Sequence, residues 1–322
     1  LEEVLREGDL HFEGGVIRQV VAALRSGKHV LLIGPPGTGK TTLARAIARA
    51  LGRKLVEVTA SSEWSRVDVI GGPSFIGGEV YWRSGALLRA IAECYRSTGG
   101  ALLLIDEINR ANMDRAFGEF FTIFSGGPSE WYLPEALLSE IKSYRDRGGK
   151  VDEAANALLE KWESLGGGPL KVPESFRLIA TMNVYDRRYL FSLGNALLRR
   201  FAVIMVENPP DVEAVLSRRC PDLEVVREVV ETYNELRSKG VEIGIALLID
   251  AARTAYELKQ DGFDAKAAVD TAFKMVIVPQ LEGLLPGQLR LAREALERRG
   301  YRASLEAFSQ LYPEASGGAV GV

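Results

Sequence analysis

A glycine-rich segment near the start of the sequence has the residue types and spacing needed to hold a phosphate group. The segment follows the pattern G-x-x-x-x-G-K-[ST], and the apolar run His29–Ile33 precedes it. Glycines let successive backbone N–H groups turn toward phosphate oxygens, and a following helix directs the positive end of its dipole at the same charge. We expect the lysine to reach the β- and γ-phosphates and the threonine after it to ligate Mg²⁺. The predicted nucleotide-binding residues are Gly34, Pro35, Pro36, Gly37, Thr38, Gly39, Lys40, Thr41 and Thr42.

Two adjacent acids follow a second apolar run. The run Ala101–Ile105 leads directly into Asp106 and Glu107. An acid at the carboxyl end of a buried strand can face the Mg²⁺ of a bound nucleotide, so Asp106 and Thr41 are the predicted metal ligands. A kinase has no need of the second acid, whereas a hydrolase uses one to orient and polarise water. Glu107 is therefore predicted to be catalytic, and the alternative is that both acids cap the next helix.

Two further signals lie at the ends of later elements. Asn183 follows the apolar run Phe176–Thr181 and is placed to hold an attacking water, although asparagine after a strand is usually a turn residue. Arg199 and Arg200 end a short helix just before the run Phe201–Val206. Either both arginines interact favourably with the negative C-terminal end of the helix dipole, or one of them is an arginine finger that reaches the γ-phosphate bound by a neighbouring subunit.

The scarce residue types exclude several classes of enzyme. The 322-residue chain has two cysteines, Cys94 and Cys220, and two histidines, His11 and His29, with no CxxC or HxxxH pair. Neither a zinc site nor Cys-His or Ser-His-Asp catalysis is therefore expected. Two distant cysteines make no disulfide framework, which indicates a reducing, cytoplasmic setting.

Charge and hydropathy also limit the partners. The formal net charge is −3, which does not favour a large nucleic-acid interface, so we predict no nucleic-acid binding by this chain alone. No apolar run approaches the roughly 20 residues of a membrane helix, and no secretion signal is visible. We therefore expect neither a membrane partner nor export.

Apolar runs alternate with amphipathic helices through residue 208, which predicts an α/β fold with a parallel sheet covered on both faces. An inserted helical hairpin is expected over residues 126–173. Beyond Pro209–Pro210 the apolar spacing becomes helical, so residues 209–312 predict an all-α lid domain and residues 313–322 a flexible tail. The five expected strands are His29–Ile33, Leu55–Thr59, Ala101–Ile105, Phe176–Thr181 and Phe201–Val206.

Four sequence blocks occur in the order found in AAA+ ATPases of the MoxR/McrB-like clade, which the chain resembles over about residues 10–312. The blocks are GPPGTGKTTLARAIA, LLLIDEINRANMDRAFGE, RLIATMNVYDRR and ALLRRF. The second and third are most similar to the McrB-like branch, the NTP-driven motor subunits of modification-dependent restriction systems. The lid segment Glu242–Ala246 has no sensor-2 arginine, as in that branch and unlike MoxR-like members.

The resemblance implies a fold, an assembly and a set of roles. The implied fold is a P-loop AAA+ sheet of order 5-1-4-3-2 with a helical lid, and the implied assembly is a ring, usually a hexamer, with active sites shared between copies. The implied cofactors are ATP and Mg²⁺. The implied roles are Walker A for Lys40 and Thr41, Walker B for Asp106 and Glu107, sensor 1 for Asn183, the finger for Arg199 or Arg200, and action across the interface for Arg110.

Both insertions have counterparts in this clade. Residues 70–87 correspond to a hairpin that normally faces the pore of the ring, and we expect Phe75, Tyr81 and Trp82 to form its packing core rather than to contact a substrate. Residues 126–173 fall where a second insert occurs, often a β-hairpin, so a helical version is a departure from the clade.

The predicted function is an oligomeric ATPase that remodels or drives a partner, such as a McrC-like nuclease or an adaptor. One alternative is a GTP-hydrolysing McrB-like motor, because Asn183-Val184-Tyr185-Asp186 has the spacing of a guanine-reading N-x-x-D. Another alternative is a nucleotide-gated assembly scaffold with little hydrolysis, which uses the helical insertion as a docking surface.

Overall fold

The computed structural model describes residues 14–76, 78–183 and 198–316. Within these ranges no helix is both long enough and apolar enough to cross a membrane. The described residues form two compact units, each of which has its own core.

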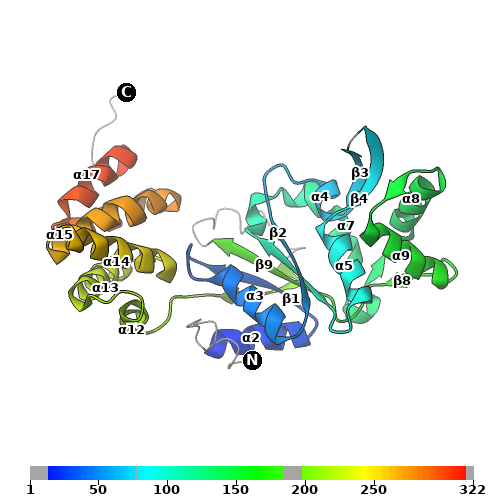
Figure 1. Ribbon diagram of the computed structural model, residues 1–322, viewed down its shortest axis with the longest axis horizontal. Helices are drawn as coiled ribbons and strands as arrows, with labels where there is room; N and C mark the ends of the chain where they lie inside the picture. Colours follow the sequence, from blue (N-terminus) through cyan, green and yellow to red (C-terminus); the bar gives the residue numbers. More distant parts are fainter. Residues whose placement is uncertain (1–13, 77, 184–197, 317–322) are drawn as a thin grey trace. The chain divides into compact units, whose positions relative to one another are not determined.

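The first unit, formed by the described residues within 14–33 and 40–205, is built on a five-stranded sheet (Figure 1). The strands are β1 (His29–Gly34), β2 (Lys54–Thr59), β5 (Ala101–Asp106), β9 (Arg177–Asn183) and β10 (Phe201–Met205). They stand in the order β10-β1-β9-β5-β2. In chain order these are the fifth, first, fourth, third and second strands of the sheet, as expected. The pairs β1 with β10, β2 with β5 and β5 with β9 are parallel.

Helices cover both faces of this sheet, because its inner strands are apolar at nearly every position. Every residue of β1 is buried, as is every residue but the last of β5 and β9. Leu103 and Ile105 share one large core with α5 (Ala86–Arg96) and α7 (Gly118–Ile123). Full burial of each large aliphatic side chain contributes about 1.5–3 kcal/mol, so this core dominates the stability of the unit.

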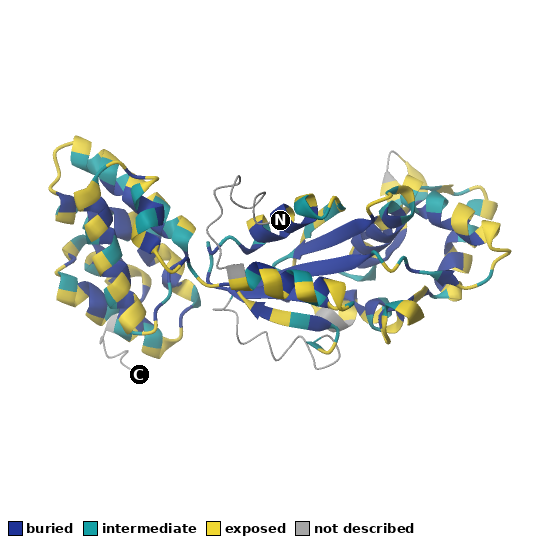
Figure 2. Cartoon of the chain, turned by 90° about the horizontal axis from the view of Figure 1, so that it is seen from below, coloured by how far each residue is buried: buried dark blue, intermediate teal, exposed yellow. Residues whose placement is uncertain are grey.

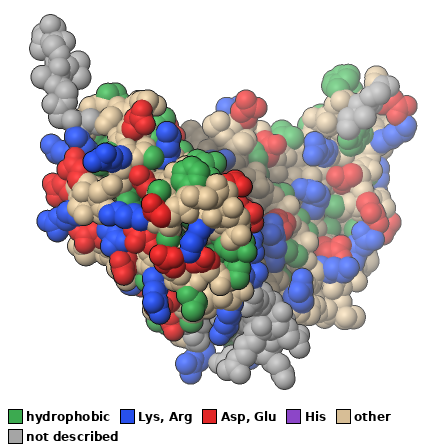
Figure 3. Space-filling view, turned by 60° about the vertical axis from the view of Figure 1, so that its left-hand side comes forward, with side chains coloured by type: hydrophobic (Ala, Val, Ile, Leu, Met, Phe, Trp, Pro, Cys, Tyr) green, Lys and Arg blue, Asp and Glu red, His purple; other side chains and the backbone are tan. Residues whose placement is uncertain are grey.

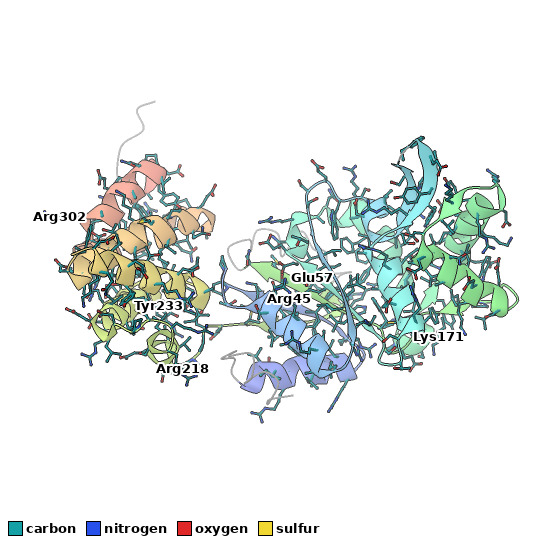
Figure 4. All side chains as sticks on the ribbon, in the orientation of Figure 1. Arg45, Glu57, Lys171, Arg218, Tyr233 and Arg302 are labelled. Atoms are coloured by element: carbon teal, nitrogen blue, oxygen red, sulfur yellow. The ribbon has the colours of Figure 1, made fainter. Side chains whose placement is uncertain are left out.

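Two helices lie outside that core and pack on the same strands. α3 (Lys40–Ala50) contacts β2, β5 and β9, and α2 (Gly14–Arg25) contacts β10. At the sheet edge, Arg45 of α3 donates from Nε to Glu57 Oε2 of β2 over 3.0 Å, and both side chains are labelled in Figure 4. Figure 2 shows the resulting pattern, with the central strands dark and the helices buried on one side only.

The two insertions are joined into one substructure at one end of the first unit (Figure 1). β3 (Gly71–Ile76) and β4 (Glu79–Ser84) form the hairpin predicted for residues 70–87. The second insertion has the two expected helices, α8 (Glu135–Asp146) and α9 (Glu153–Ser164). Between them the two residues of β7 (Lys150–Val151) pair with β4, which makes a three-stranded sheet of order β3-β4-β7. The helical insertion also contains the short antiparallel pair β6 (Tyr132–Leu133) and β8 (Leu170–Lys171). Its helical periodicity predicted none of these three strands.

Asp152 holds this junction together. Its Oδ2 accepts the backbone N–H of Ser84 over 2.6 Å, and its Oδ1 accepts the Ser84 hydroxyl over 2.7 Å. The same carboxylate caps α9 by accepting the N–H of Ala155. A side-chain cap of this kind is worth about 1 kcal/mol, so one residue both starts the helix and fastens it to the hairpin.

The hairpin aromatics do not all lie in a core. Trp82 is buried, at 1% exposed, as expected. Tyr81 is half-buried, and Phe75 is 77% exposed. The expectation of a packing role is therefore wrong for Phe75, which lies near the hairpin end opposite Val80, a residue that is itself 37% exposed.

The second unit contains residues 34–39 and 206–316, and the part that follows residue 206 is helical. Aspartates 211, 222 and 264 cap three of its helices with their side chains. Acidic and basic side chains are interspersed over the face of this unit that Figure 3 presents. Its α-helices are α12 (Val212–Ser217), α13 (Leu223–Ser238), α14 (Ile245–Gln260), α15 (Ala265–Ala272), α16 (Pro286–Arg299) and α17 (Arg302–Leu311).

The start of the predicted tail belongs to this helical unit. Pro313–Ser316 form a 3-10 turn in which Ala315 is buried, and the N–H of Ala315 donates to the carbonyl of Tyr312. The turn forms because Tyr312 is itself fixed, its hydroxyl donating to the carbonyl of Val278. Residues 317–322 of the predicted tail lie outside the described residues.

Candidate active site

The predicted phosphate-binding segment forms a tight turn between β1 and α3. Gly37 and Gly39 adopt left-handed backbone angles, with φ of +78° and +84°. Residues with a side chain rarely adopt these angles, so the turn requires glycine at both positions. The hydroxyl of Thr38 donates to the carbonyl of Pro35 over 3.0 Å and closes the turn. Lys40, at 6% exposed, starts α3, and the helix N-terminus therefore follows directly on the loop, as a phosphate site requires.

The turn, residues 34–39, is part of the second compact unit, where it contacts the start of α14. The N–H of Ala246 donates to the carbonyl of Gly37 over 3.0 Å. Gly244 is the N-cap of α14, and a Cβ at this position would overlap the carbonyl oxygen of Pro36. The segment that lacks a sensor-2 arginine thus contacts the phosphate loop through its backbone.

Asp106 is held by two hydroxyl groups. The Thr41 hydroxyl donates to Asp106 Oδ1 over 2.6 Å, and the Thr181 hydroxyl donates to the same oxygen over 2.6 Å. Thr41 comes from the first turn of α3, Asp106 from the end of β5 and Thr181 from β9. The structure therefore brings the two predicted metal ligands together.

Glu107 lies next to this carboxylate in an unusual backbone conformation. Its φ of 52° and ψ of 48° are left-handed, and among the described residues it is the one non-glycine residue with a positive φ. Such conformations cost about 1–3 kcal/mol and cluster at functional sites. The amide of Asn183 donates to Glu107 Oε1 over 3.2 Å. The predicted catalytic acid and the predicted sensor asparagine are therefore neighbours.

Arg110 pairs with Glu107 of its own chain. Arg110 Nε lies 2.6 Å from Glu107 Oε2, one turn along the 3-10 helix Ile108–Arg110. The side chains of Arg110 and Glu107 are 59% and 25% exposed, and an ion pair in such a setting contributes at most about 1 kcal/mol. Either residue can therefore leave this ion pair for another partner at little cost in free energy.

The two candidate finger arginines have different surroundings. Arg200 donates from Nε to the carbonyl of Phe124 over 2.6 Å and from Nη2 to the carbonyl of Phe121 over 2.7 Å. Its guanidinium also lies over the ring of Phe121, and burial together with the charge of Arg199 lowers its pKa. Arg199 is exposed, and its backbone carbonyl accepts a hydrogen bond from Lys28 Nζ over 2.9 Å.

Sequence reasoning missed Thr181 as a site residue. The residue lies two positions before Asn183, and side chains two apart on a strand share a face, so the strand that presents Asn183 also presents Thr181. The two-residue spacing from Asn183 could therefore have identified Thr181 as a site residue. The residues Val184–Asp186 of the possible guanine-reading motif lie outside the described residues, while the Asn183 side chain is engaged with Glu107.

The donor set fits a nucleotide-bound Mg²⁺. This ion is usually held by one or two carboxylates together with phosphate oxygens and waters, rather than by a cage of protein ligands. Thr41 and Asp106 supply a hydroxyl and a carboxylate at the end of the phosphate loop. In the described ranges no group of three or more His, Cys, Asp or Glu side chains is placed to hold a metal.

Comparison with known proteins gives one family and several relatives. The profile of the AAA domain (dynein-related subfamily) matches residues 29–201. Midasin of Giardia intestinalis is 31% identical over 173 residues, covering 52% of this chain and 3% of midasin. Protein NorQ of Paracoccus denitrificans is 36% identical over 102 residues, covering 32% of this chain and 36% of NorQ.

A third relative aligns with more of the chain. The type IV methyl-directed restriction enzyme EcoKMcrB subunit of Escherichia coli K12 is 26% identical over 253 residues, covering 74% of this chain and 48% of that subunit. The chain therefore spans less than half the length of each of these three relatives.

Proposed function

Because the chain belongs to the AAA domain family, dynein-related subfamily, as its resemblance to the MoxR/McrB-like clade predicted, we propose that it hydrolyses ATP with Mg²⁺ at sites shared between neighbouring copies. The observation that carries this proposal is the contact between Asn183 and Glu107, beside the Thr41–Asp106 pair. A phosphate loop and a metal-binding acid alone would serve a kinase equally well. Hydrolysis also needs a group that activates water, and a second acid oriented by an asparagine supplies it.

Each residue of the site has a defined task in this proposal. The loop Gly34–Gly39 and Lys40 hold the phosphates, and the dipole of α3 adds to their attraction. Bound Mg²⁺ neutralises charge that develops on the phosphate oxygens. Glu107 accepts a proton from the attacking water, and Asn183 keeps the carboxylate turned toward that water.

We assign the finger to Arg199 and an anchoring role to Arg200. A finger must reach a phosphate outside its own chain, so its guanidinium has to be available at the surface. Arg199 is exposed, whereas Arg200 is engaged with two carbonyls near the end of α7. The resulting assembly is a ring in which Arg199 of one copy meets the nucleotide held by Lys40 of the next.

The partner class follows from the relatives. EcoKMcrB is a subunit of a restriction enzyme, so a nuclease subunit of the McrC kind, or an adaptor, is the partner we propose for this chain. ATP is favoured over GTP because the first residue of the guanine-reading spacing, Asn183, bonds Glu107. A scaffold with little hydrolysis is disfavoured because it would have no use for that pairing.

Phosphate release from ATP and from GTP, measured side by side over a range of protein concentrations, tests the proposal. Shared sites predict that turnover per chain rises with protein concentration and then levels off as the ring fills. ATP turnover is expected to exceed GTP turnover. Turnover per chain that is independent of concentration would contradict shared sites, and faster GTP turnover would select the GTP-driven alternative.

A further inference from the structure

We propose that Thr181 is a positioning residue that holds both acids of the site through its one hydroxyl group. Thr181 is 1% exposed and stands on β9, two residues before Asn183. The inference rests on the proposed function and deepens it, because it names a residue outside the nucleotide-binding motifs on which the metal-binding acid and the catalytic acid both depend.

The hydrogen-bond chemistry of Thr181 fixes the direction of each contact. The backbone N–H of Glu107 can only donate, so Thr181 Oγ1 accepts it, over 2.9 Å. The single hydroxyl proton of Thr181 is then directed to Asp106 Oδ1, 2.6 Å away. One hydroxyl therefore bridges the backbone of one acid and the side chain of the other.

The contact with Asp106 decides which oxygen is left for the metal. Thr41 and Thr181 both donate to Oδ1, so among the described contacts the two lone pairs of this oxygen are used. Oδ2 is then the oxygen of Asp106 that would be left to hold a bound Mg²⁺. Hydrogen bonds from hydroxyls to a carboxylate are among the stronger ones, so loss of one lets the carboxylate rotate.

The contact with Glu107 holds a strained backbone. Glu107 has a left-handed φ of 52°, which other residues of the described ranges adopt only as glycine. The bond from its N–H to Thr181 fixes the turn that aims its side chain at Asn183. A free N–H at this point would allow the turn to relax to an ordinary conformation, and Glu107 would lose its contact with Asn183.

The test compares Thr181→Val, which keeps the shape and removes the hydroxyl, with Thr181→Ser, which keeps the hydroxyl. Thr232→Val is the matched control, because Thr232 is equally buried and its hydroxyl also has two partners, in the second unit. Binding of a fluorescent ATP analogue is titrated with Mg²⁺, and kcat and KM for ATP are measured on the full chain.

For Thr181→Val we expect the Mg²⁺ concentration for half-maximal ATP binding to rise at least about fivefold and kcat to fall at least about tenfold, with KM changed less than threefold. Binding of the analogue without Mg²⁺ is expected to stay within twofold of wild type. Thr181→Ser should restore both quantities to within about threefold. Thr232→Val should lower the melting temperature and leave the Mg²⁺ requirement unchanged.

Several results would overturn the inference. They are a Thr181→Val chain with the wild-type Mg²⁺ requirement and kcat, a Thr181→Ser chain as impaired as Thr181→Val, or a Thr232→Val chain with the same shift in Mg²⁺ requirement. These results leave the proposed function intact. A wild-type chain that binds ATP without turnover removes the proposed hydrolysis, and the Mg²⁺ titration alone then decides the role of Thr181. A wild-type chain that does not bind ATP at all overturns both.

Discussion

Thr41 donates its hydroxyl proton to Asp106 Oδ1 over 2.6 Å, which joins two sequence motifs that lie 65 residues apart. The contact forms because α3 begins at the carboxyl end of β1 and Asp106 ends β5, so the ends of parallel strands meet at one edge of the sheet. The fold thus brings together groups that are distant in the sequence. The motifs supply the groups, and the sheet order places them within bonding distance.

Replacement of Lys40 by alanine should abolish tight nucleotide binding. Lys40 is buried at the start of α3, and removal of its charge from a phosphate site is expected to weaken ATP binding about 10- to 100-fold or more. Calorimetric titration with ATP and Mg²⁺ measures this directly. Lys142→Ala serves as the control, because Lys142 pairs with Asp146 on α8 in the helical insertion. Equal affinities in the two variants would contradict the assignment of the loop.

Arg199→Ala and Arg200→Ala should fail in different ways. Arg199→Ala is expected to lower ATP turnover about 1,000-fold or more at unchanged stability, since arginine fingers are worth factors of this size. Arg200→Ala is expected to lower the free energy of unfolding by about 1–3 kcal/mol, because the carbonyls of Phe121 and Phe124 lose their partner. Turnover and urea denaturation of both variants make the comparison.

A mixing experiment separates action across the interface from action within one chain. Arg199→Ala chains keep an intact phosphate loop, and Lys40→Ala chains keep an intact finger. Mixing the two inactive chains should restore part of the turnover, because a Lys40→Ala copy can offer Arg199 to the site of its neighbour. Absence of any recovery in mixtures that do assemble would count against the trans assignment.

Gly244→Ala should weaken nucleotide binding without touching the nucleotide. A Cβ on Gly244 would overlap the carbonyl of Pro36, so the phosphate loop must shift. Overpacking of this kind costs about 1–3 kcal/mol, and we expect ATP affinity to fall about fivefold or more. Gly287→Ala is the control, since a Cβ there meets nothing within 4 Å. An unchanged affinity in Gly244→Ala would show that the loop does not depend on this contact.

His29 should make the stability of the fold depend on pH. Its Nδ1 accepts the N–H of Leu178, and burial, followed by the charges of Arg177, Arg200 and Lys28, lowers its pKa from 6.5 to about 3. The unfolded chain therefore binds the proton first as the pH falls. The free energy of unfolding that depends on neutral His29 is fully present above pH 6.5. It is lost as the pH falls from 6.5 to 3.

The slope of that loss is measurable. We expect His29 to account for a loss of about 1.4 kcal/mol per pH unit once the pH is below 6.5. His29→Asn keeps an acceptor for the N–H of Leu178 but has no titrating group. Urea denaturation at pH 7.5 and 5.5 should therefore give a smaller difference in the free energy of unfolding for His29→Asn than for wild type. Equal differences in the two chains would refute the assignment.

The elements of the site were predictable because their signals are local. The phosphate loop is a contiguous pattern, and Asp106 and Glu107 directly follow an apolar run, so their chemistry can be deduced without knowing the fold. The sheet order followed from resemblance to a known clade. The strand ends agree with the structure to within one or two residues, because fully buried strands are marked by continuous apolar runs.

The features that escaped prediction depend on distant partners. The pairing of Lys150–Val151 with β4 involves only two residues, which is too short for any periodicity to be visible. Arg110 and Glu107 are three residues apart, but their contact can be inferred only when the left-handed turn at Glu107 is known. The role of Thr181 likewise depends on how β5 and β9 are paired.

Measurement of ATP binding and ATP turnover in Glu107→Gln decides whether Glu107 activates the attacking water. Glutamine keeps the shape and an amide oxygen that Asn183 can still contact, but it cannot accept a proton from water. We expect ATP affinity within about threefold of wild type and turnover lowered at least about 100-fold, the size expected for loss of a general base. Turnover close to that of wild type would contradict the assignment of Glu107 as the residue that activates water.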